Sequence, residues 1–210
     1  MNDFLEHWTE WLSGFAGASP LEWTATLAGF VCVYLVIKRN IWCFFFGLIQ
    51  VSLYSWIFYD VKLYSDMILH IVYIGFQLYG YLIWSKNLED RHHVVVHPGS
   101  GSYYLKMMLL VVLTTLVWGW LMANRTDASL PYYDAFTTCT SLVAQWLLSH
   151  KKLLNWSFWI VVDIVAIWVY WQKGLYPTSA LYLCLLIMAI IGQWQWYKSY
   201  RRGLSVEKHA

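Results

Sequence analysis

Charged side chains are scarce in this chain of 210 residues, where Asp, Glu, Lys and Arg together make up 12%. Soluble domains usually carry about 25%, so the sequence lacks the charge that a water-soluble surface needs. The net charge is only +2, with no basic arm and no glycine-rich phosphate loop, which argues against nucleic acid as a partner. Apolar residues make up 60% and aromatic residues 20%. This composition predicts an all-α integral membrane protein, because membrane interfaces favour Trp and Tyr.

Metal-binding patterns are also missing. The four cysteines lie in apolar segments without the spacing of metal ligands, and we interpret them as small core residues. They are Cys32, Cys43, Cys139 and Cys184. His70 is the single histidine inside an apolar stretch, whereas an intramembrane lipid-modifying enzyme would need clustered His, Asp or Glu. We therefore expect no metal, no cofactor and no enzymatic activity, and such an enzyme is the alternative from a different class.

Seven apolar stretches are long enough to cross a bilayer, which takes about twenty helical residues. They span residues 21–37, 41–59, 63–84, 104–122, 135–149, 154–172 and 176–197. The connections after the first, third, fifth and seventh stretches, with their flanks, hold eleven Lys and Arg residues, against three on the opposite side. Because cytoplasmic loops are enriched in these residues, we expect the N-terminus outside and the C-terminus in the cytoplasm. The spacing of apolar residues within 1–19 predicts an amphipathic helix on the membrane surface.

An internal repeat relates the first three stretches to the last three. Trp84 recurs as Trp196 at an offset of 112 residues, and the second and sixth stretches align near 113, which places Gln50 opposite Asp163. Two parallel three-helix repeats joined by a linker helix follow, and solute sites in such proteins lie between the repeats near the midplane. The expected divisions are a surface segment at 1–19, a first repeat at 20–86, a cytoplasmic loop and linker helix at 87–123, a second repeat at 124–198 and a basic cytoplasmic tail at 199–210.

Polar side chains inside these stretches predict a solute site. An Asp at the centre of a membrane helix costs about 2.5–3.5 kcal/mol on insertion scales, so such residues face the bundle interior or a cavity. The candidate substrate-binding residues are Gln50, Tyr54, His70, Tyr73, Gln77, Thr138, Ser141, Gln145, Trp156, Trp159, Asp163 and Gln193. Indole and phenol rings suit a flat heterocycle, amides supply donors and acceptors, and a carboxylate balances positive charge. The set favours a planar, water-soluble molecule, which Asp163 allows to be cationic, over a bare ion.

Several of these residues also have a purely structural interpretation. Gln145 and Ser141 could bond only a neighbouring helix, Trp156 could anchor the chain at the membrane interface, and His70 could donate to a backbone carbonyl. Asp163 is the hardest to explain in this way, because it lies in the middle of an otherwise apolar run.

Three sequence runs resemble PnuC-type vitamin transporters, and the resemblance covers roughly residues 20–200. The runs are FFGLIQV at 45–51, VKLY at 61–64 and NWSFW at 155–159, the last resembling that family's Trp-x-x-Trp element. The resemblance implies a SWEET-like arrangement of three, one and three helices in the bacterial inner membrane. It also implies facilitated diffusion of an unphosphorylated vitamin, a homotrimer among membrane lipids, and a cytoplasmic kinase that traps the vitamin inside the cell.

Within the family, the substitutions suggest thiamine as the transported vitamin, with nicotinamide riboside as the alternative. The nicotinamide riboside branch tends to have Asn where this chain has Gln50 and Asp163, and Gln and Asn where it has His70 and Gln77. All four departures lie on the predicted cavity faces. Thiamine offers a permanent cation and an aminopyrimidine that pairs donors with acceptors. Nicotinamide riboside is cationic too, so charge does not decide between them, whereas neutral, bulky riboflavin gains less from a carboxylate.

Overall fold

The structure, a computed structural model, describes residues 19–60, 64–86, 96–126, 130–172, 174 and 176–207. Every helix or strand assigned in these residues is an α-helix, which confirms the all-α prediction. The helices are α2 (Pro20–Ile37), α3 (Cys43–Asp60), α4 (Tyr64–Ser85), α5 (Gly101–Arg125), α6 (Pro131–Ser149), α7 (Asn155–Gln172) and α8 (Tyr176–Glu207). The surface helix that we expected over 1–19 lies outside the described residues, apart from Ser19.

Local sequence signals set the helix ends. Ser19 and Glu22 form a capping box at the start of α2, where the Ser19 hydroxyl accepts from the Glu22 N–H at 3.2 Å. Pro131 begins α6 ahead of the predicted boundary at 135, since proline suits the first turn of a helix. At the other end of the chain α8 continues to Glu207, beyond the predicted span of 176–197 and into the residues 199–210 that we expected to form a basic tail. The basic residues there are good helix formers, so the helix extends past its apolar part.

Five of the described helices are long and apolar enough to span a bilayer, namely α2, α3, α4 from Met67, α5, and α8 between Thr178 and Arg202. Helices α6 and α7, for which we also predicted spans, are not among these five, and they carry Gln145 and Asp163. Helix α6 contacts α4, α5 and α7, and α7 contacts α6 and α8. These neighbours provide protein surroundings for polar side chains that lipid would not tolerate.

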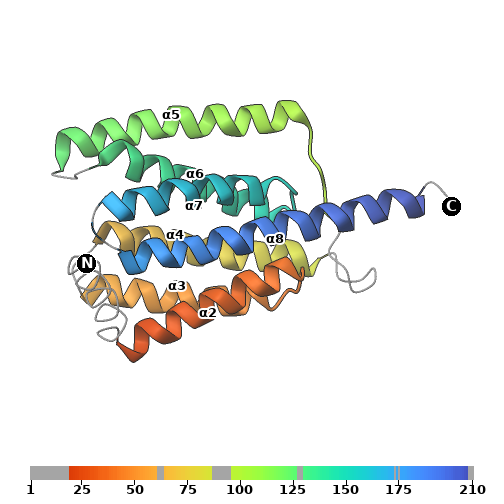
Figure 1. Cartoon of the computed structure of the whole chain (residues 1–210), viewed down its shortest axis with the longest axis horizontal. Coiled ribbons are helices and arrows are strands. Elements are labelled where there is room, and N and C mark those ends of the chain that lie inside the picture. The colour runs from red at the N-terminus through yellow and green to blue at the C-terminus, as the bar shows by residue number, and fades with distance from the viewer. Residues whose placement is uncertain are drawn as a thin grey trace, which may run out of the picture.

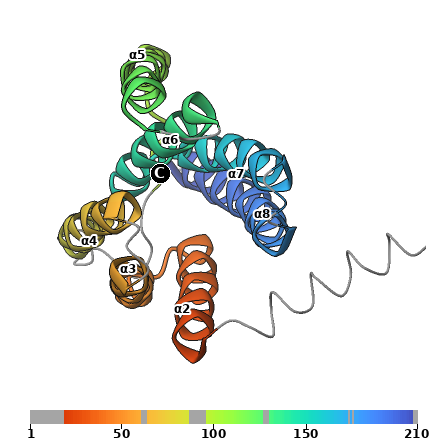
Figure 2. The same ribbon diagram turned by 90° about the vertical axis from the view of Figure 1, so that its left-hand side faces the viewer.

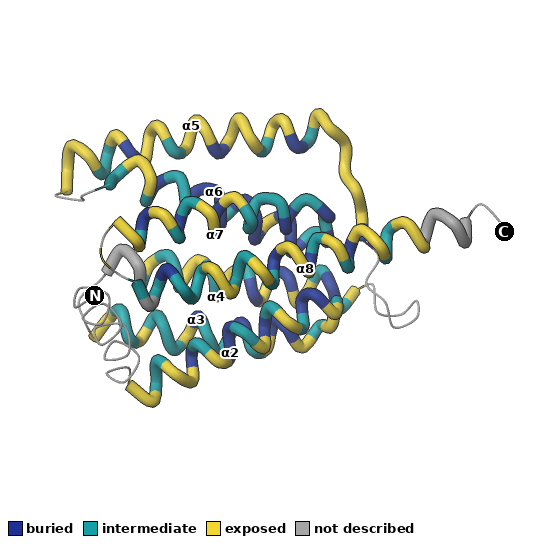
Figure 3. The backbone as a smooth tube through the Cα atoms, in the orientation of Figure 1, coloured by how far each residue is buried: buried dark blue, intermediate teal, exposed yellow. Residues whose placement is uncertain are grey.

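The helices form two groups of three with one helix outside them. Consecutive helices run antiparallel, so the connections alternate between the two ends of the bundle (Figure 1). Seen end-on, α2, α3 and α4 lie on one side and α6, α7 and α8 on the other, while α5 packs outside against α6 (Figure 2). The groups meet along two seams, α2 against α8 and α4 against α6, and contacts across the seams are sparser than contacts within a group. Exposed residues cover α5 and the outer faces (Figure 3).

One end of the bundle carries the α2–α3 turn, the α6–α7 turn and the last part of α8 (Figure 1). We term it the basic end, after Lys38, Arg39, Lys151, Lys152 and Arg202. The largest buried apolar cluster lies there and includes residues of both groups. The connections that we predicted to be cytoplasmic, because they are rich in Lys and Arg, therefore lie at one end of the bundle.

The α2–α3 and α6–α7 turns have matching backbone geometry. Arg39 has a φ of 57° and Lys151 a φ of 56°, in the left-handed region that few residues other than glycine adopt. The N–H of Arg39 donates to the Val36 carbonyl, and that of Lys151 to the Leu148 carbonyl, each at 2.9 Å. Both pairs of positions are separated by 112 residues, the offset found in the sequence.

A short segment before α5 fastens to the second of these turns. The His97 N–H donates to the Lys151 carbonyl and the Leu153 N–H donates to the His97 carbonyl, both at 3.0 Å. Burial, followed by the positive charges of Lys152 and Lys151, lowers the pKa of His97. The backbone of His97 thus bonds the α6–α7 turn, and its imidazole is neutral at physiological pH.

Candidate functional site

Three predicted site residues lie together in an aromatic cluster between α3 and α4. The ring centroids of Tyr54 and His70 are 5.7 Å apart, and those of His70 and Tyr73 are 5.9 Å apart. Sequence reasoning missed two further members. Phe58 packs against His70 at 4.9 Å, and Thr26 of α2 shares a 2.9 Å hydrogen bond with the Tyr54 hydroxyl. Aromatic faces and hydroxyl groups thus meet in the half of the bundle away from the basic end.

Tyr73 connects this cluster to the other group of helices. Its side chain lies near Ser141 on α6, and Ser141 itself donates to the Thr137 carbonyl of its own helix. Gln145, one turn further along α6, is buried, and Thr138 is half-buried. Tyr73 and Ser141 therefore lie on the α4–α6 seam, the position that a site between two helix groups requires.

Asp163 lies in the middle of α7 with 3% of its surface exposed. Its carboxylate forms no hydrogen bond or ion pair with any of the described residues. Tyr182 of α8 lies near Asp163 and Tyr73, and its ring stacks on that of Tyr170 at 5.2 Å between centroids. The sequence did not lead us to either tyrosine. A buried carboxylate without a partner is costly, so a cation or a proton from outside the chain must neutralise it.

Gln50 and Gln77 each insert between two helices, against a glycine. The Gln50 amide packs on Gly29 of α2, where an added Cβ atom would lie 2.7 Å from its Nε2. The Gln77 amide packs on Gly47 of α3, where the corresponding distance is 2.5 Å. Glycine at these positions lets the amides approach the neighbouring backbone, as small residues do at membrane helix interfaces.

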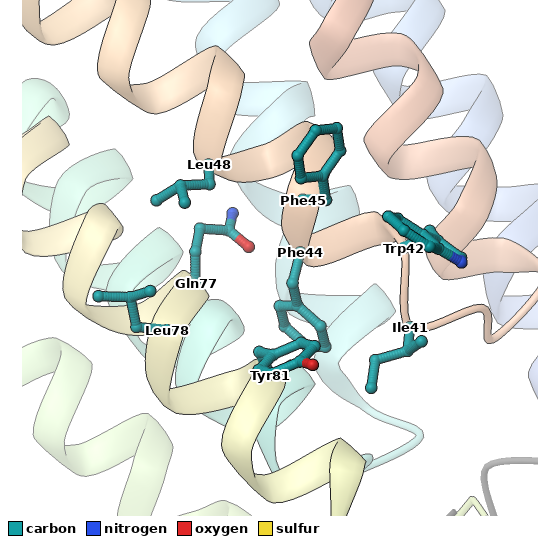
Figure 4. A pocket seen from close by; sticks show the side chains of 8 residues that line it. All are labelled: Ile41, Trp42, Phe44, Phe45, Leu48, Gln77, Leu78 and Tyr81. Atoms are coloured by element: carbon teal, nitrogen blue, oxygen red, sulfur yellow. The ribbon is translucent and has the colours of Figure 1, made fainter.

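Gln77 also lines a groove of about 370 Å³ between α3 and α4 (Figure 4). Phe45 and Leu48 of α3 form one wall, and Leu78 and Tyr81 of α4 form the other. Because Phe45, Leu78 and Tyr81 are exposed, the groove opens on the outer face of the bundle. The structure therefore separates Gln77 from Tyr73, although the sequence placed both on one helix face.

Trp156 belongs to a different cluster, close to the basic end. Its indole meets the ring of Trp196 edge-on at 5.7 Å, and its Nε1 is buried with no hydrogen-bond partner among the described residues. Because the side chain is buried, Trp156 is not an interface anchor. Trp159 packs beside the same core, and Gln193 accepts a 3.2 Å hydrogen bond from Ser157. The unpaired indole N–H is a donor that a solute can use, since buried donors in proteins are almost always bonded.

An apolar exterior around aromatic, amide and carboxylate side chains defines a multi-pass membrane protein with a polar interior. The chain belongs to the nicotinamide mononucleotide transporter family, whose sequence profile matches residues 19–198. The relationship to PnuC-type vitamin transporters that the sequence suggested is thereby confirmed.

Individual relatives cover nearly the whole chain. The nicotinamide riboside transporter PnuC of Escherichia coli is 25% identical over 92% of this chain and 93% of its own length. The protein of the same name from Neisseria mucosa is 31% identical over 91% of this chain and 81% of its own length. The crystal structure of the vitamin B3 transporter PnuC superposes with a TM-score of 0.72 at 28% identity, and the match covers 94% of this chain and 90% of that chain.

These relatives bear on the substrate. Their names give nicotinamide riboside, which was the alternative in the sequence analysis, and none of these names supports thiamine, which was our main expectation. They are also named as transporters, which favours transport over the lipid-modifying enzyme.

Proposed function

We propose that this chain carries nicotinamide riboside across the membrane by facilitated diffusion. The observation that supports this most is Asp163, a buried carboxylate with no ion-pair partner among the described residues. The pyridinium ring of nicotinamide riboside is a delocalised cation, which a carboxylate and nearby aromatic rings attract. The names of the relatives point to the same vitamin.

The pathway that we propose runs between the two groups of helices. Tyr73 and Ser141 lie on one seam, and Asp163 interacts with Tyr182 near Tyr73. In this proposal the pathway has two levels, one with Tyr73, Ser141 and Asp163 and, nearer the basic end, one with Trp156, whereas Gln50 and Gln77 pack between helices of the first group. The matching turns at Arg39 and Lys151 support an origin of the two groups as parallel repeats with α5 as linker.

In the cell, we propose that the basic end faces the cytoplasm of a bacterium and that the protein lies in the inner membrane. The Lys and Arg residues at that end support this orientation. We propose further that transport needs no ion gradient, because a cytoplasmic kinase removes the vitamin as it enters. The family resemblance also suggests a homotrimer.

Calorimetric titration of the purified protein with nicotinamide riboside, thiamine and riboflavin tests the substrate. The proposal predicts saturable binding of nicotinamide riboside and much weaker heats with the other two. Tight binding of thiamine alone would instead show that the substitutions at Gln50, His70, Gln77 and Asp163 set a different specificity. Nicotinamide mononucleotide is a useful control, because its phosphate adds negative charge beside Asp163.

A further inference from the structure

Two tryptophans join the helix groups reciprocally at the basic end. The Trp84 indole N–H on α4 donates to the Leu148 carbonyl at the end of α6, at 3.4 Å. The Trp196 indole N–H on α8 donates to the Val36 carbonyl at the end of α2, at 3.1 Å. Each bond crosses one of the two seams, and both tryptophans have 0% of their surface exposed. Each group of helices therefore holds the other by the same contact.

The left-handed turns strengthen both joints. The Lys151 ammonium lies 5.9 Å from the centre of the Trp84 ring, and burial lowers the pKa of this lysine. In the other joint, the Arg39 guanidinium donates to the Ser199 hydroxyl on α8, one turn beyond Trp196. A left-handed backbone costs about 1–2 kcal/mol for a residue with a side chain. We expect the contacts made by the Arg39 and Lys151 side chains to offset this cost. Each turn directs a cation onto the helix that carries the tryptophan of the opposite group.

These joints lie where a passage between the groups would open. In the described residues the backbones of the two groups come closest along the α2–α8 and α4–α6 seams, and the rings of Trp84 and Trp196 meet between these seams at 6.2 Å. Trp196 also packs on Trp156, which we place in the pathway. A solute leaving between the groups at the basic end would have to separate the indoles from their carbonyls. Rigid-body movement of two helix groups commonly provides such alternating access.

We propose that Trp84 and Trp196 form a clasp that closes the cytoplasmic end of the pathway and opens when the vitamin is released. This inference rests on the proposed function, because it assigns the two residues to the movement that transport requires. The clasp is closed in this structure. Its two halves act on different seams, so loss of either indole N–H weakens closure while the other half persists.

Cys43 reports the state of the clasp without any substrate. It begins α3, has 1% of its surface exposed and belongs to the same buried cluster as Trp84 and Trp196. Thiol modification follows exposure, so opening at the basic end should make Cys43 reactive. The test uses a variant whose three other cysteines are alanine (C32A, C139A and C184A), in inside-out and right-side-out membrane vesicles with a charged, impermeant thiosulfonate.

Replacing tryptophan by phenylalanine keeps a ring and removes the N–H. Because one net hydrogen bond corresponds to about a fivefold change in an equilibrium, we expect W84F and W196F each to speed Cys43 modification about fivefold in inside-out vesicles, and the double variant more. The matched control is W194F, which removes an exposed indole two residues from Trp196. We expect the control to modify at the parent rate.

The outcomes separate the clasp from the transport proposal. Unchanged modification in W84F and W196F, in protein that elutes as the parent does, would overturn the clasp whatever vitamin is carried. Acceleration in right-side-out vesicles alone would overturn its assignment to the cytoplasmic end. If the double variant does not fold, the single variants decide. Counterflow of nicotinamide riboside, measured separately in the parent, reports on the proposed function alone.

Discussion

Replacing Asp163 by asparagine should weaken binding of the cationic vitamin without weakening the fold. The substitution removes the charge and keeps the size of the side chain. At an effective dielectric of 20, a carboxylate attracts a unit charge at 8 Å by about 2 kcal/mol, which is roughly thirtyfold in Kd. Because Asp163 has 3% of its surface exposed and its carboxylate is unpaired among the described residues, loss of the charge should leave the melting temperature of the vitamin-free protein unchanged or raised.

Reduced nicotinamide riboside provides the sharpest comparison, because its ring has nearly the same shape and no charge. Calorimetry of D163N should show the loss of affinity with the oxidised vitamin and little change with the reduced one. The control is D60N, which removes an exposed carboxylate at the end of α3. A change below about twofold with the oxidised vitamin, or roughly 0.4 kcal/mol, would refute the counter-ion role. An equal loss with both forms would show that Asp163 acts through shape or hydrogen bonding instead.

Two further predictions concern packing and pH. Gly192→Ala places a Cβ atom 2.6 Å from the Trp156 ring and should cost about 1–3 kcal/mol of stability by overpacking, seen as a lower melting temperature, whereas Gly75→Ala, with no atom within 4 Å, should not. Burial and two neighbouring lysines lower the pKa of His97 from 6.5, so the contact made by its segment should weaken as pH falls below that value. Exchange of the Leu153 amide, corrected for its intrinsic rate, should then accelerate at pH 5.5 in the parent and not in H97N.

The sequence predicted the helices well because their hydropathy is strong and their turns are short. Four predicted spans both begin and end within about two residues of the observed helices, as is usual for strongly periodic segments. Helix α8 is longer than its predicted span, since hydropathy marks the apolar part of a helix and not its end. Lys198, Arg201 and Arg202 continue the helix as readily as apolar residues do.

The sequence predicts an internal repeat, but it does not fix the register of that repeat. The contact of Phe44 with Gly80 corresponds to that of Trp156 with Gly192 at an offset of 112. Extended along α3 and α7, this offset pairs Asp163 with Val51, one residue from the pairing with Gln50 that we inferred. A sequence this rich in aromatic and β-branched residues aligns almost equally well in either register.

The polar residues of the candidate site were visible in the sequence, whereas their grouping was not. Helical spacing placed Tyr73 and Gln77 on one face of a helix, yet Tyr73 reaches α6 and Gln77 packs on α3. Which neighbour a side chain meets depends on how the helices pack, and spacing along one helix does not contain that information. Tyr170 and Tyr182 were missed for the same reason, because a tyrosine in an apolar run looks alike whether it faces lipid or protein.

The most direct test of the central proposal is the flux of nicotinamide riboside into proteoliposomes that contain this protein and no ion gradient. We predict uptake that equilibrates across the membrane, saturates with vitamin concentration and is competed by unlabelled nicotinamide riboside. Enclosing a nicotinamide riboside kinase with ATP should then raise accumulation beyond equilibrium. Flux no faster than in protein-free liposomes, or flux that requires a proton or sodium gradient, would contradict the account.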